Sequence, residues 1–173
     1  NSSSGVDILL NGPNEALQAF LDQLNNHPPA LAKIDLITTS PFPAQNLSDF
    51  TILPSLVEDG QFVPISPDMS ICADCQRELF DPSNHRYRYP FINCTNCGPR
   101  FTIVEGIPYD RAQTTMRDFP MCHACRLEYE NPLDRRFHAE PIACHDCGPR
   151  LLLTDAEVRE PGNDPISRAR DLL

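Results

Sequence analysis

The chain of 173 residues has no tryptophan, and no stretch approaches the roughly 18 consecutive apolar residues that a bilayer span needs. The start of the chain, Asn1-Ser2-Ser3-Ser4-Gly5, also lacks a basic n-region and an apolar h-region. These absences disfavour a membrane protein and a secretory precursor, and we expect a cytoplasmic protein. Because the first residue is not Met, a cleaved leader or a truncated chain is left open.

Positive charge is scarce in the first part of the chain, where residues 1–71 contain one lysine and eight acidic residues. The formal net charge of the whole chain is −10, so long-range repulsion disfavours nucleic acid as a partner. Residues 72–150 are nearly neutral, with ten arginines and eleven acidic residues. A local basic patch is therefore still compatible with the sequence.

Cysteine is absent outside residues 72–147, where eight cysteines form four Cys-x-x-Cys pairs. Within each half, 18 residues separate the two pairs, a spacing typical of a four-thiolate zinc site. Two thiolates three positions apart in a tight turn can point at one ion, and two such turns complete a tetrahedron. We therefore predict two structural zinc ions per chain. The predicted ligands are Cys72, Cys75, Cys94 and Cys97 for the first ion, and Cys122, Cys125, Cys144 and Cys147 for the second.

Other interpretations of these cysteines are a disulfide framework, redox-active dithiols, or iron in place of zinc. The spacing does not separate zinc from iron, whereas the short gaps favour consecutive pairs of turns over pairs crossed between the halves. His123 and His145 lie inside two of the turns, where a side chain normally points away from the metal. Gly98 and Gly148 follow the second pair of each half, and a glycine at this place permits a left-handed backbone that lets the chain curl around the ion.

The first cysteine module recurs 50 positions later, because residues 72–100 and 122–150 align without gaps with 11 identities in 29 positions. The chain therefore contains an internal duplication. Each copy is too small to bury a sufficient core, so we expect the metal to stabilise it. The identities besides cysteine pair Glu78 with Glu128, Pro82 with Pro132, Arg86 with Arg136, Ile92 with Ile142, and Gly-Pro-Arg at 98–100 with Gly-Pro-Arg at 148–150.

Short elements are expected inside the modules. Residues 81–84 and 131–134 combine Pro with Asp and Asn, which predicts turns. Residues 87–92 and 101–104 carry aromatic and β-branched side chains, which predicts short strands. Four arginines near these aromatics could bind an acidic partner or form an exposed rim over the aromatic rings. They are Arg86, Arg88, Arg135 and Arg136.

Residues 5–53 have the pattern of an α/β unit. Apolar residues alternate at 6–10, recur at helical spacing from Leu17 to Leu24 after Gly12-Pro13, and alternate again at 32–39 and 50–53. This order predicts a strand, a helix and two strands in a two-layer sandwich that is too thin by itself, so we expect residues 1–53 to fold poorly unaided. Prolines punctuate 54–70 and predict a linker, and residues 164–173 begin an amphipathic helix. We expect the chain to be cut at both ends.

Three long motifs run through the middle of the chain. They are Tyr87-Arg88-Tyr89-Pro90-Phe91-Ile92-Asn93-Cys94-Thr95-Asn96-Cys97-Gly98-Pro99-Arg100-Phe101-Thr102-Ile103, then Pro108-Tyr109-Asp110-Arg111, and Asp134-Arg135-Arg136-Phe137-His138-Ala139-Glu140-Pro141. On the duplicated cysteine frame, these motifs closely resemble the HypF family of hydrogenase-maturation carbamoyltransferases. Residues 28–35, Pro-Pro-Ala-Leu-Ala-Lys-Ile-Asp, extend the resemblance to the N-terminal segment.

The resemblance implies an α+β fold, in which a partial ferredoxin-like (acylphosphatase-type) α/β sandwich is followed by two duplicated four-cysteine zinc-finger modules. The implied domains are residues 1–56, the C-terminal half of an acylphosphatase-like domain; 57–69, a linker; 70–119 and 120–151, the two zinc-finger modules; and 152–173, a linker and the start of a YrdC-like nucleotide-binding domain. Asn1 aligns with the catalytic Asn of the family's acylphosphatase site, whose Arg loop would lie upstream.

The resemblance also implies the chemistry of a complete protein. Such a protein would hydrolyse carbamoyl phosphate and use ATP to form carbamoyl-adenylate. It would then transfer the carbamoyl group to the C-terminal Cys of a HypE-like partner, for the cyanide ligand of nickel–iron hydrogenase. Since one catalytic side chain without its phosphate cradle cannot stabilise the transferring group, we expect this chain alone to be inactive. The competing classes are a zinc-ribbon adaptor for nucleic acid or protein and a redox-active dithiol protein; no membrane partner is expected.

Overall fold

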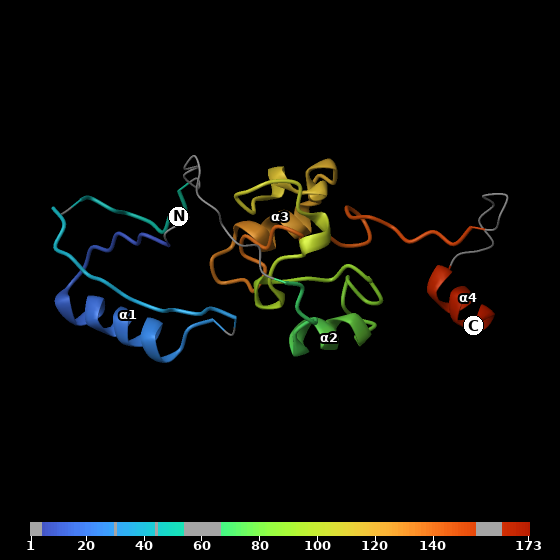
Figure 1. Cartoon of the computed structure of the whole chain (residues 1–173), viewed down its shortest axis with the longest axis horizontal. Helices are drawn as coiled ribbons and strands as arrows, with labels where there is room; N and C mark the ends of the chain where they lie inside the picture. Colours follow the sequence, from blue (N-terminus) through green and yellow to red (C-terminus); the bar gives the residue numbers. More distant parts are fainter. Residues whose placement is uncertain (1–4, 30, 44, 54–66, 155–163) are drawn as a thin grey trace.

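The computed structural model describes residues 5–29, 31–43, 45–53, 67–154 and 164–173 (Figure 1). A cysteine-rich centre, residues 67–150, lies between an N-terminal segment with helix α1 (Asn14–Asn26) and a C-terminal helix, α4 (Pro165–Leu172). In Figure 1, α1 and α4 lie at opposite ends of the long axis. Within the described ranges, no helix is both long and apolar enough to cross a bilayer.

Helix α1 forms where the apolar spacing predicts it. The helix starts directly after Pro13, whose fixed φ suits a helix start, and ends before His27. Leu17, Leu21 and Leu24 recur at intervals of four and three residues and are half-buried, while most of the helix is exposed. These three leucines form the face that α1 turns toward the rest of the chain, whereas Phe20, the fourth residue of the predicted stripe, is exposed.

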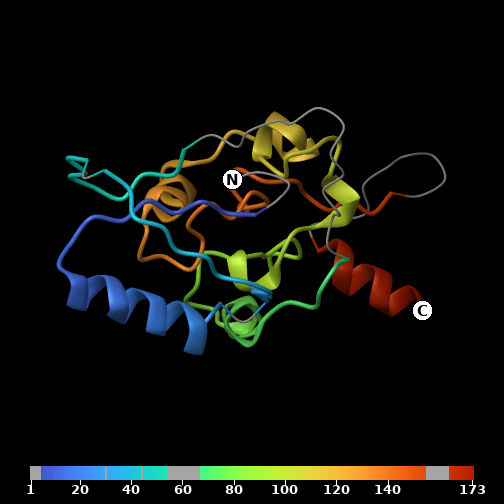
Figure 2. The same ribbon diagram turned by 60° about the vertical axis from the view of Figure 1, so that its left-hand side comes forward.

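The strands predicted at 6–10, 32–39 and 50–53 do not form among the described residues, so this prediction was wrong. The segments are extended without being paired into a ladder (Figure 2). Their apolar side chains remain in solvent, with Val6 69% and Leu36 80% exposed. In a split β-α-β unit, a further strand lies between the two strands that flank the helix. Because the described residues contain no strand in that place, the backbone groups of the flanking segments find no ladder partners among them.

Each cysteine module begins with a short helix that the sequence pattern did not predict. Helix α2 (Ala73–Phe80) starts after Cys72, whose Sγ accepts a hydrogen bond from the Cys75 N–H at 3.5 Å. Helix α3 (His123–Glu130) starts at the equivalent position, directly after Cys122, without a hydrogen bond to the Cys122 side chain. The two residues between the cysteines thus form a first helical turn, which points both sulfurs of a pair in one direction.

Turns follow both helices at 81–84 and 131–134, as predicted, with hydrogen bonds from Asn84 N to Asp81 O (3.0 Å) and from Asp134 N to Asn131 O (2.9 Å). The short strands predicted at 87–92 and 101–104 are absent. Residues 87–91 are mostly turns, and residues 101–103 form the 3-10 helix η2 (Phe101–Ile103). Local bonds explain this outcome, because the Tyr87 and Tyr89 N–H groups are already used by carbonyls three residues back.

Two equivalent residues of the repeat share an unusual backbone conformation, which confirms the duplication. Arg88 and His138, which are equivalent in the repeat, are the non-glycine residues with left-handed backbone in the described chain, at φ 57° and 48°. Each N–H donates back to the preceding helix, from Arg88 to Leu79 O at 2.8 Å and from His138 to Tyr129 O at 3.1 Å. Because this conformation is costly for a non-glycine residue, its presence in both copies indicates that both modules fold around the same constraint.

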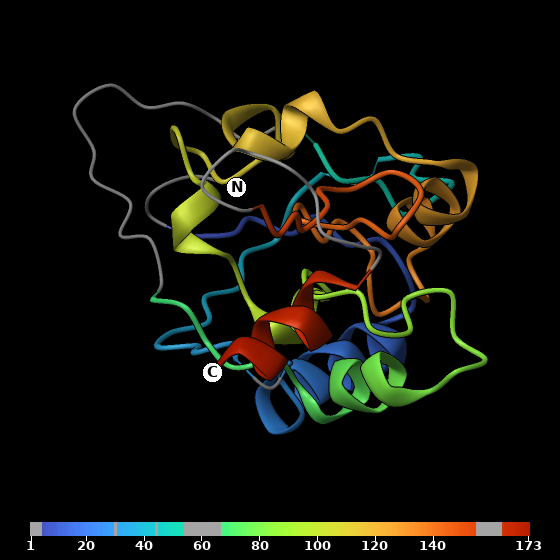
Figure 3. The ribbon, with the colours of Figure 1, turned by 90° about the vertical axis from the view of Figure 1, so that its right-hand side faces the viewer.

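The segment 105–119, at the end of the first module, contains η3 (Arg111–Gln113) and η4 (Thr115–Asp118). The 3-10 helix η1 (Thr95–Cys97) directly follows Cys94 and contains Cys97. An isolated antiparallel bridge joins Val104 to Thr114. The 3-10 helices η3 and η4 are the yellow ones at the top of Figure 3. The segment contacts the surroundings of both cysteine groups, because the Tyr109 hydroxyl accepts from the Arg100 N–H at 3.2 Å and the Arg111 side chain donates to Glu140 O at 2.6 Å.

Two small clusters of buried side chains form the core of the cysteine-rich centre, and cysteines supply much of both. The first contains Tyr89 and Ile92 with three cysteines of the first module, and it also includes Ala143 of the second module. Cys147 packs against both clusters. The two modules therefore share a core and form one folding unit.

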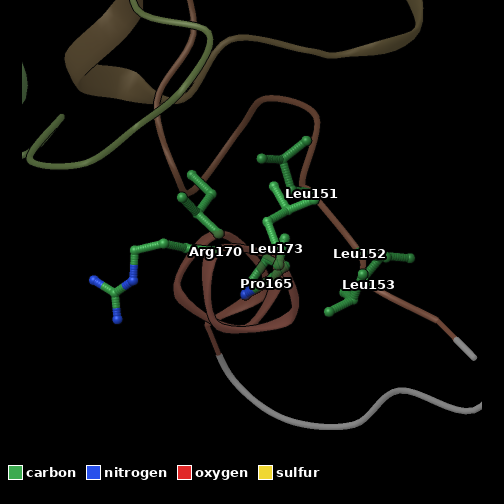
Figure 4. A pocket seen from close by; sticks show the side chains of 8 residues that line it. Leu151, Leu152, Leu153, Pro165, Arg170 and Leu173 are labelled. Atoms are coloured by element: carbon green, nitrogen blue, oxygen red, sulfur yellow. The ribbon is translucent and has the colours of Figure 1, made fainter.

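Helix α4 confirms the amphipathic helix predicted from Asp164 onward. The Asp164 carboxylate caps it by accepting from the Ser167 N–H at 3.1 Å. Its apolar side faces the extended residues 151–153 across an open apolar pocket (Figure 4). Arg88 attaches α4 to the first module through an ion pair of 3.1 Å with Asp164. Most of the predicted linker 57–69 lies outside the described residues.

Candidate metal centres

The first metal centre is a group of four sulfur atoms at the starts of α2 and η1. Cys72 Sγ lies 3.6 Å from Cys94 Sγ, which lies 3.7 Å from Cys97 Sγ, and the four sulfurs including Cys75 are within 4.8 Å of one another. The Cys72 N–H donates to Cys97 Sγ at 3.3 Å. Three of the four cysteines are buried, so the group is closed to solvent on most sides.

The second metal centre repeats the first with α3 and the turn at 144–147. Cys122 Sγ lies 3.7 Å from Cys144 Sγ, and Cys147 Sγ lies 3.8 Å from Cys144 Sγ and 3.6 Å from Cys125 Sγ. The eight sulfurs thus fall into the two consecutive sets of four that the spacing predicts. No disulfide is formed among them.

The sulfur positions fit zinc. A tetrahedral ion with bonds of about 2.3 Å to sulfur separates neighbouring sulfurs by about 3.8 Å. The observed separations of 3.6–3.8 Å match this edge length in both groups. A disulfide would instead require a sulfur separation of about 2.05 Å. The predicted cofactor, two zinc ions per chain, agrees with this geometry.

The two glycines after the second cysteine pairs differ in backbone conformation, although a glycine permits a left-handed backbone at both places. Gly98 has a left-handed φ of 73°. Gly148 lies outside that region, and its small size matters for another reason. A Cβ at Gly148 would lie 2.0 Å from the Tyr89 hydroxyl oxygen and 2.6 Å from Ala143 Cβ. The second glycine is therefore required by the close approach of the first module.

Gly148→Ala is accordingly expected to destabilise the zinc-loaded chain by about 1–3 kcal/mol, the usual cost of overpacking. Urea denaturation in excess zinc would measure the change. Gly12→Ala is the matched control, since nothing lies within 4 Å of the added methyl group there. Tyr89→Phe removes the oxygen from the clash and should recover part of the loss. Equal stability of Gly148→Ala and the unchanged chain would contradict the packing described here.

Tyr89 extends from the first module to the second metal centre. It is 1% exposed, its ring meets the His145 ring edge-on at a centroid distance of 5.1 Å, and its hydroxyl has no hydrogen-bond partner in the described chain. Burial raises the pKa of Tyr89, and the thiolates of Cys147 and Cys144 raise it further. The His145 Nε2 atom contacts Tyr87 O at 2.9 Å, so this imidazole faces away from the sulfurs as expected.

Arg86 crosses from the first module into the second. It is 1% exposed, and its Nε donates to Ala143 O at 2.8 Å. Its terminal nitrogens donate to the two carboxylate oxygens of Glu128 at 3.0 and 2.5 Å, and Nη2 also reaches Cys125 Sγ at 3.2 Å. The guanidinium thus joins the carboxylate of α3 and a cysteine sulfur of the second metal centre.

Arg136 makes the reciprocal crossing from the second module into the first. It is 4% exposed, its Nε donates to Asn93 O at 3.0 Å, and its Nη2 pairs with Glu78. The neighbouring Arg135 also pairs with Glu78, at 2.5 Å, and donates to Cys75 Sγ at 3.0 Å. Burial would raise the pKa of Glu78, but hydrogen bonds from the two arginines outweigh it and the pKa is lowered overall.

These contacts relate the modules by an approximate two-fold symmetry, because each contact of Arg86 has a counterpart 50 residues away. The interpretation of Arg86, Arg135 and Arg136 as a partner-binding patch or an exposed rim was therefore wrong. Opposite charge in the other module holds these side chains inside the protein. Only Arg88 of the four is substantially exposed, at 47% of its side chain. The sequence did carry a signal, since Glu and Arg at fixed offsets recur in both copies beside the cysteines.

A second buried network holds the segment 105–119 against the second module. The Arg111 side chain donates to Glu140 O, Ile142 O and Phe119 O at 2.6, 3.0 and 2.7 Å. The Glu140 carboxylate accepts from the Arg111 N–H at 2.6 Å and from the Tyr129 hydroxyl. Burial raises the pKa of Glu140, and burial lowers the pKa of Arg111. Arg111 of the second motif and Glu140 of the third thus hold each other in place.

The predicted catalytic residue, Asn1, lies outside the described residues. His85 contacts Glu128 at 3.9 Å and lies near Cys125, at the place where the repeat puts Arg135 in the other module. The two centres therefore have unequal surroundings, with two arginines beside the first and one arginine and a histidine beside the second.

Comparison with known proteins gives a match to a family model, described as the HypF finger, at residues 71–104 and 121–154. These two matches contain the two groups of cysteines and helices α2 and α3. Each match ends beyond the Gly-Pro-Arg sequence that closes a module. The duplication found in the sequence is thus a duplication of this finger.

Curated relatives cover the same region. The chain is 43% identical over 120 residues to carbamoyltransferase HypF of Synechocystis sp., and 48% identical over 122 residues to carbamoyltransferase HypF2 of Cupriavidus necator. It is 46% identical over 113 residues to the probable carbamoyltransferase HypF of Methanocaldococcus jannaschii. These alignments cover 69%, 69% and 64% of this chain and 15% of each relative. The chain therefore spans a small part of the length of the curated relatives that it matches.

Solved structures extend the similarity over almost the whole chain. A crystal structure of full-length HypF in the phosphate- and nucleotide-bound form matches with a TM-score of 0.82 and 50% identity. The match covers 94% of this chain and 21% of that protein. The structure of T. kodakarensis HypF matches with a TM-score of 0.78 and 50% identity, over 97% of this chain and 21% of that one.

Proposed function

The chain belongs to the HypF carbamoyltransferase family, whose zinc-finger region it carries, and from this premise we propose that its two cysteine modules are structural zinc sites of a hydrogenase-maturation enzyme. Cys72, Cys75, Cys94 and Cys97 are the proposed ligands of one ion, and Cys122, Cys125, Cys144 and Cys147 those of the other. The observation that carries the proposal is the pair of four-sulfur groups with edges of 3.6–3.8 Å.

The chemistry of the sites supports a structural role. Four thiolates close the coordination of a tetrahedral ion, so no position is left for a water molecule or a substrate. When bound, zinc would cross-link the start of the helix to the turn that contains the second cysteine pair in each module. The cysteine side chains hold the ion, and the arginines and the shared core fix the cysteines.

The enzymatic context is proposed from the relatives, whose names are those of carbamoyltransferases. A complete protein of this kind would act on carbamoyl phosphate and ATP and transfer the carbamoyl group to a HypE-like partner. Residues 1–56 would belong to an acylphosphatase-like domain, with Asn1 as its catalytic amide. Residues 57–69 would be a linker, and 152–173 would lead into a YrdC-like domain. The two modules, 70–119 and 120–151, would join those domains as a scaffold.

Metal analysis and an activity assay together test this proposal. The reduced, purified chain is expected to contain two zinc ions by elemental analysis. Incubated with carbamoyl phosphate, with and without ATP, it is expected to release phosphate no faster than buffer, because the scaffold offers no open metal position. A value of one ion or none in a folded sample would overturn the structural-zinc proposal. Phosphate release that disappears with the zinc would overturn the scaffold role.

A further inference from the structure

Each metal centre is bordered by guanidinium groups that come from the other module. Arg135 of the second module donates to Cys75 Sγ of the first centre at 3.0 Å, and Arg136 Nη2 lies 4.0 Å from the same sulfur. Arg86 of the first module donates to Cys125 Sγ of the second centre at 3.2 Å. Cys75 and Cys125 are equivalent in the repeat and are both fully buried. The hydrogen bonds that each group of sulfurs accepts therefore include donors from the other module.

Such donors are needed because a zinc ion with four thiolates leaves an excess of negative charge in a buried place. Burying uncompensated charge is costly, and hydrogen bonds to the sulfurs reduce that cost. The guanidinium groups of the arginines supply both these hydrogen bonds and a positive charge. Each centre thus obtains its charge compensation from a side chain whose backbone belongs to the other centre's module.

The crossing arginines are fixed in place by the module that they enter. Glu128 on α3 holds Arg86 with two bonds of 3.0 and 2.5 Å, and Ala143 O accepts from its Nε. Glu78 on α2 pairs with Arg136, and Asn93 O accepts from its Nε. These anchors lie on the same helix as the cysteine, or directly beside the second cysteine pair. If a module loses its metal and unfolds locally, its glutamate and backbone carbonyl no longer hold the arginine of the other module. Its own arginine also stops donating a hydrogen bond to the sulfur of the other metal centre.

We propose that the two zinc sites retain metal as a coupled pair, in which Arg86 is a positioning residue for the second site and Arg135 and Arg136 are positioning residues for the first. The inference rests on the proposed structural zinc role and adds that loss of either ion weakens the other. By reciprocity, the coupling must be equal in both directions.

The test is a chelator titration in which the reactive cysteines are identified. The zinc-loaded chain and its variants are exposed to rising concentrations of a zinc chelator, the freed thiols are alkylated, and the modified cysteines are located by peptide mass spectrometry. Arg136→Met is expected to release the zinc held by Cys72, Cys75, Cys94 and Cys97, the module that does not carry the substitution. The chelator concentration needed should fall by about 10- to 100-fold, as for other outer contacts of metal ligands. Arg86→Met is expected to do the same to the opposite set.

Arg77→Met is the matched control, because Arg77 is an exposed arginine on α2 that pairs with Asp74. Arg136→Lys keeps a charge and should lose less zinc than Arg136→Met. If Arg136→Met does not fold, Arg135→Met serves in its place, since Arg135 is more exposed and Glu78 retains its other partner.

Alkylation that begins in the module carrying the substitution, or a titration equal to that of Arg77→Met, would overturn the coupling. The two proposals fail differently. If the chain without substitutions binds fewer than two zinc ions, the proposal of two structural zinc sites is wrong. Two retained ions with no effect of the arginines contradict only the coupling.

Discussion

Removal of zinc is expected to unfold residues 71–150 completely. The two buried clusters of this region contain few large apolar side chains, and cysteines account for three of seven buried members in the first and two of four in the second. A structural zinc ion contributes on the order of 10–16 kcal/mol in small modules. Whole domains are stable by only about 5–15 kcal/mol, so a fold with so small a core cannot survive the loss of both ions.

The unfolding can be followed by nuclear magnetic resonance, as the dispersed amide signals of α2 and α3 collapse on addition of excess chelator under reducing conditions. Chelator already saturated with zinc is the control, and re-addition of zinc should restore the spectrum. Cys75→Ser and Cys125→Ser, at equivalent positions of the repeat, should each reduce the zinc content. Retention of the dispersed signals without metal would show that side-chain packing alone maintains the centre.

Glu78→Gln is expected to cost about 3–5 kcal/mol, the usual penalty when one partner of a buried ion pair is removed. Glu78 is the shared carboxylate of Arg135 and Arg136, whose side chains are 19% and 5% exposed. The amide keeps the volume and one acceptor but removes the charge, so Arg135 loses its carboxylate partner and Arg136 keeps only a contact of 3.9 Å with Glu128. The loss should exceed that of a surface substitution severalfold.

Urea denaturation in excess zinc would measure this cost, and a loss of this size moves the midpoint by at least about 1 M. Glu130→Gln is the control, because Glu130 is an exposed carboxylate at the end of α3. The equivalent Glu128→Gln should be destabilising as well, since it leaves Arg86 unpaired at 1% exposure. If Glu78→Gln and Glu130→Gln unfold at the same urea concentration, the reciprocal ion pairs do not hold the modules together.

The metal centres could be predicted from the sequence because their determinants are local. Two cysteines in one turn point the same way, and a gap of 18 residues returns the chain to the same ion. Helix α4 and the turns at 81–84 and 131–134 were predictable for the same reason, since capping and turn residues act within a few positions. The helices that begin at the first cysteine pair of each module were missed, because eight-residue segments such as α2 carry little periodic signal.

The interface between the modules could not be read in the same way. Arg86 meets Glu128 from 42 residues away, and Arg136 meets Glu78 from 58 residues away, so no local pattern brings them together. An arginine in a polar stretch is ordinarily exposed, which is why it was interpreted as surface. The usable signal was the repeat itself, because a Glu and an Arg that recur with the cysteines have a role in both copies.

The strands of the N-terminal segment fail for a related reason. Alternation of apolar residues at 6–10 reports which side chains share a face, but a strand exists only when another strand accepts its hydrogen bonds. The described residues of 5–53 offer α1 as a cover for that face and no adjoining strand. The Asn11 side chain reaches Gln45 O at 2.8 Å, so the segment is closed by a side chain rather than by a ladder.

Zinc K-edge X-ray absorption of the reduced chain tests the arrangement of the eight sulfurs most directly. Two zinc ions per chain, each with four sulfur neighbours at about 2.3 Å and no nitrogen or oxygen, are the predicted result. A first shell that mixes sulfur with nitrogen or oxygen, or an occupancy of one ion shared by both modules, would contradict the account.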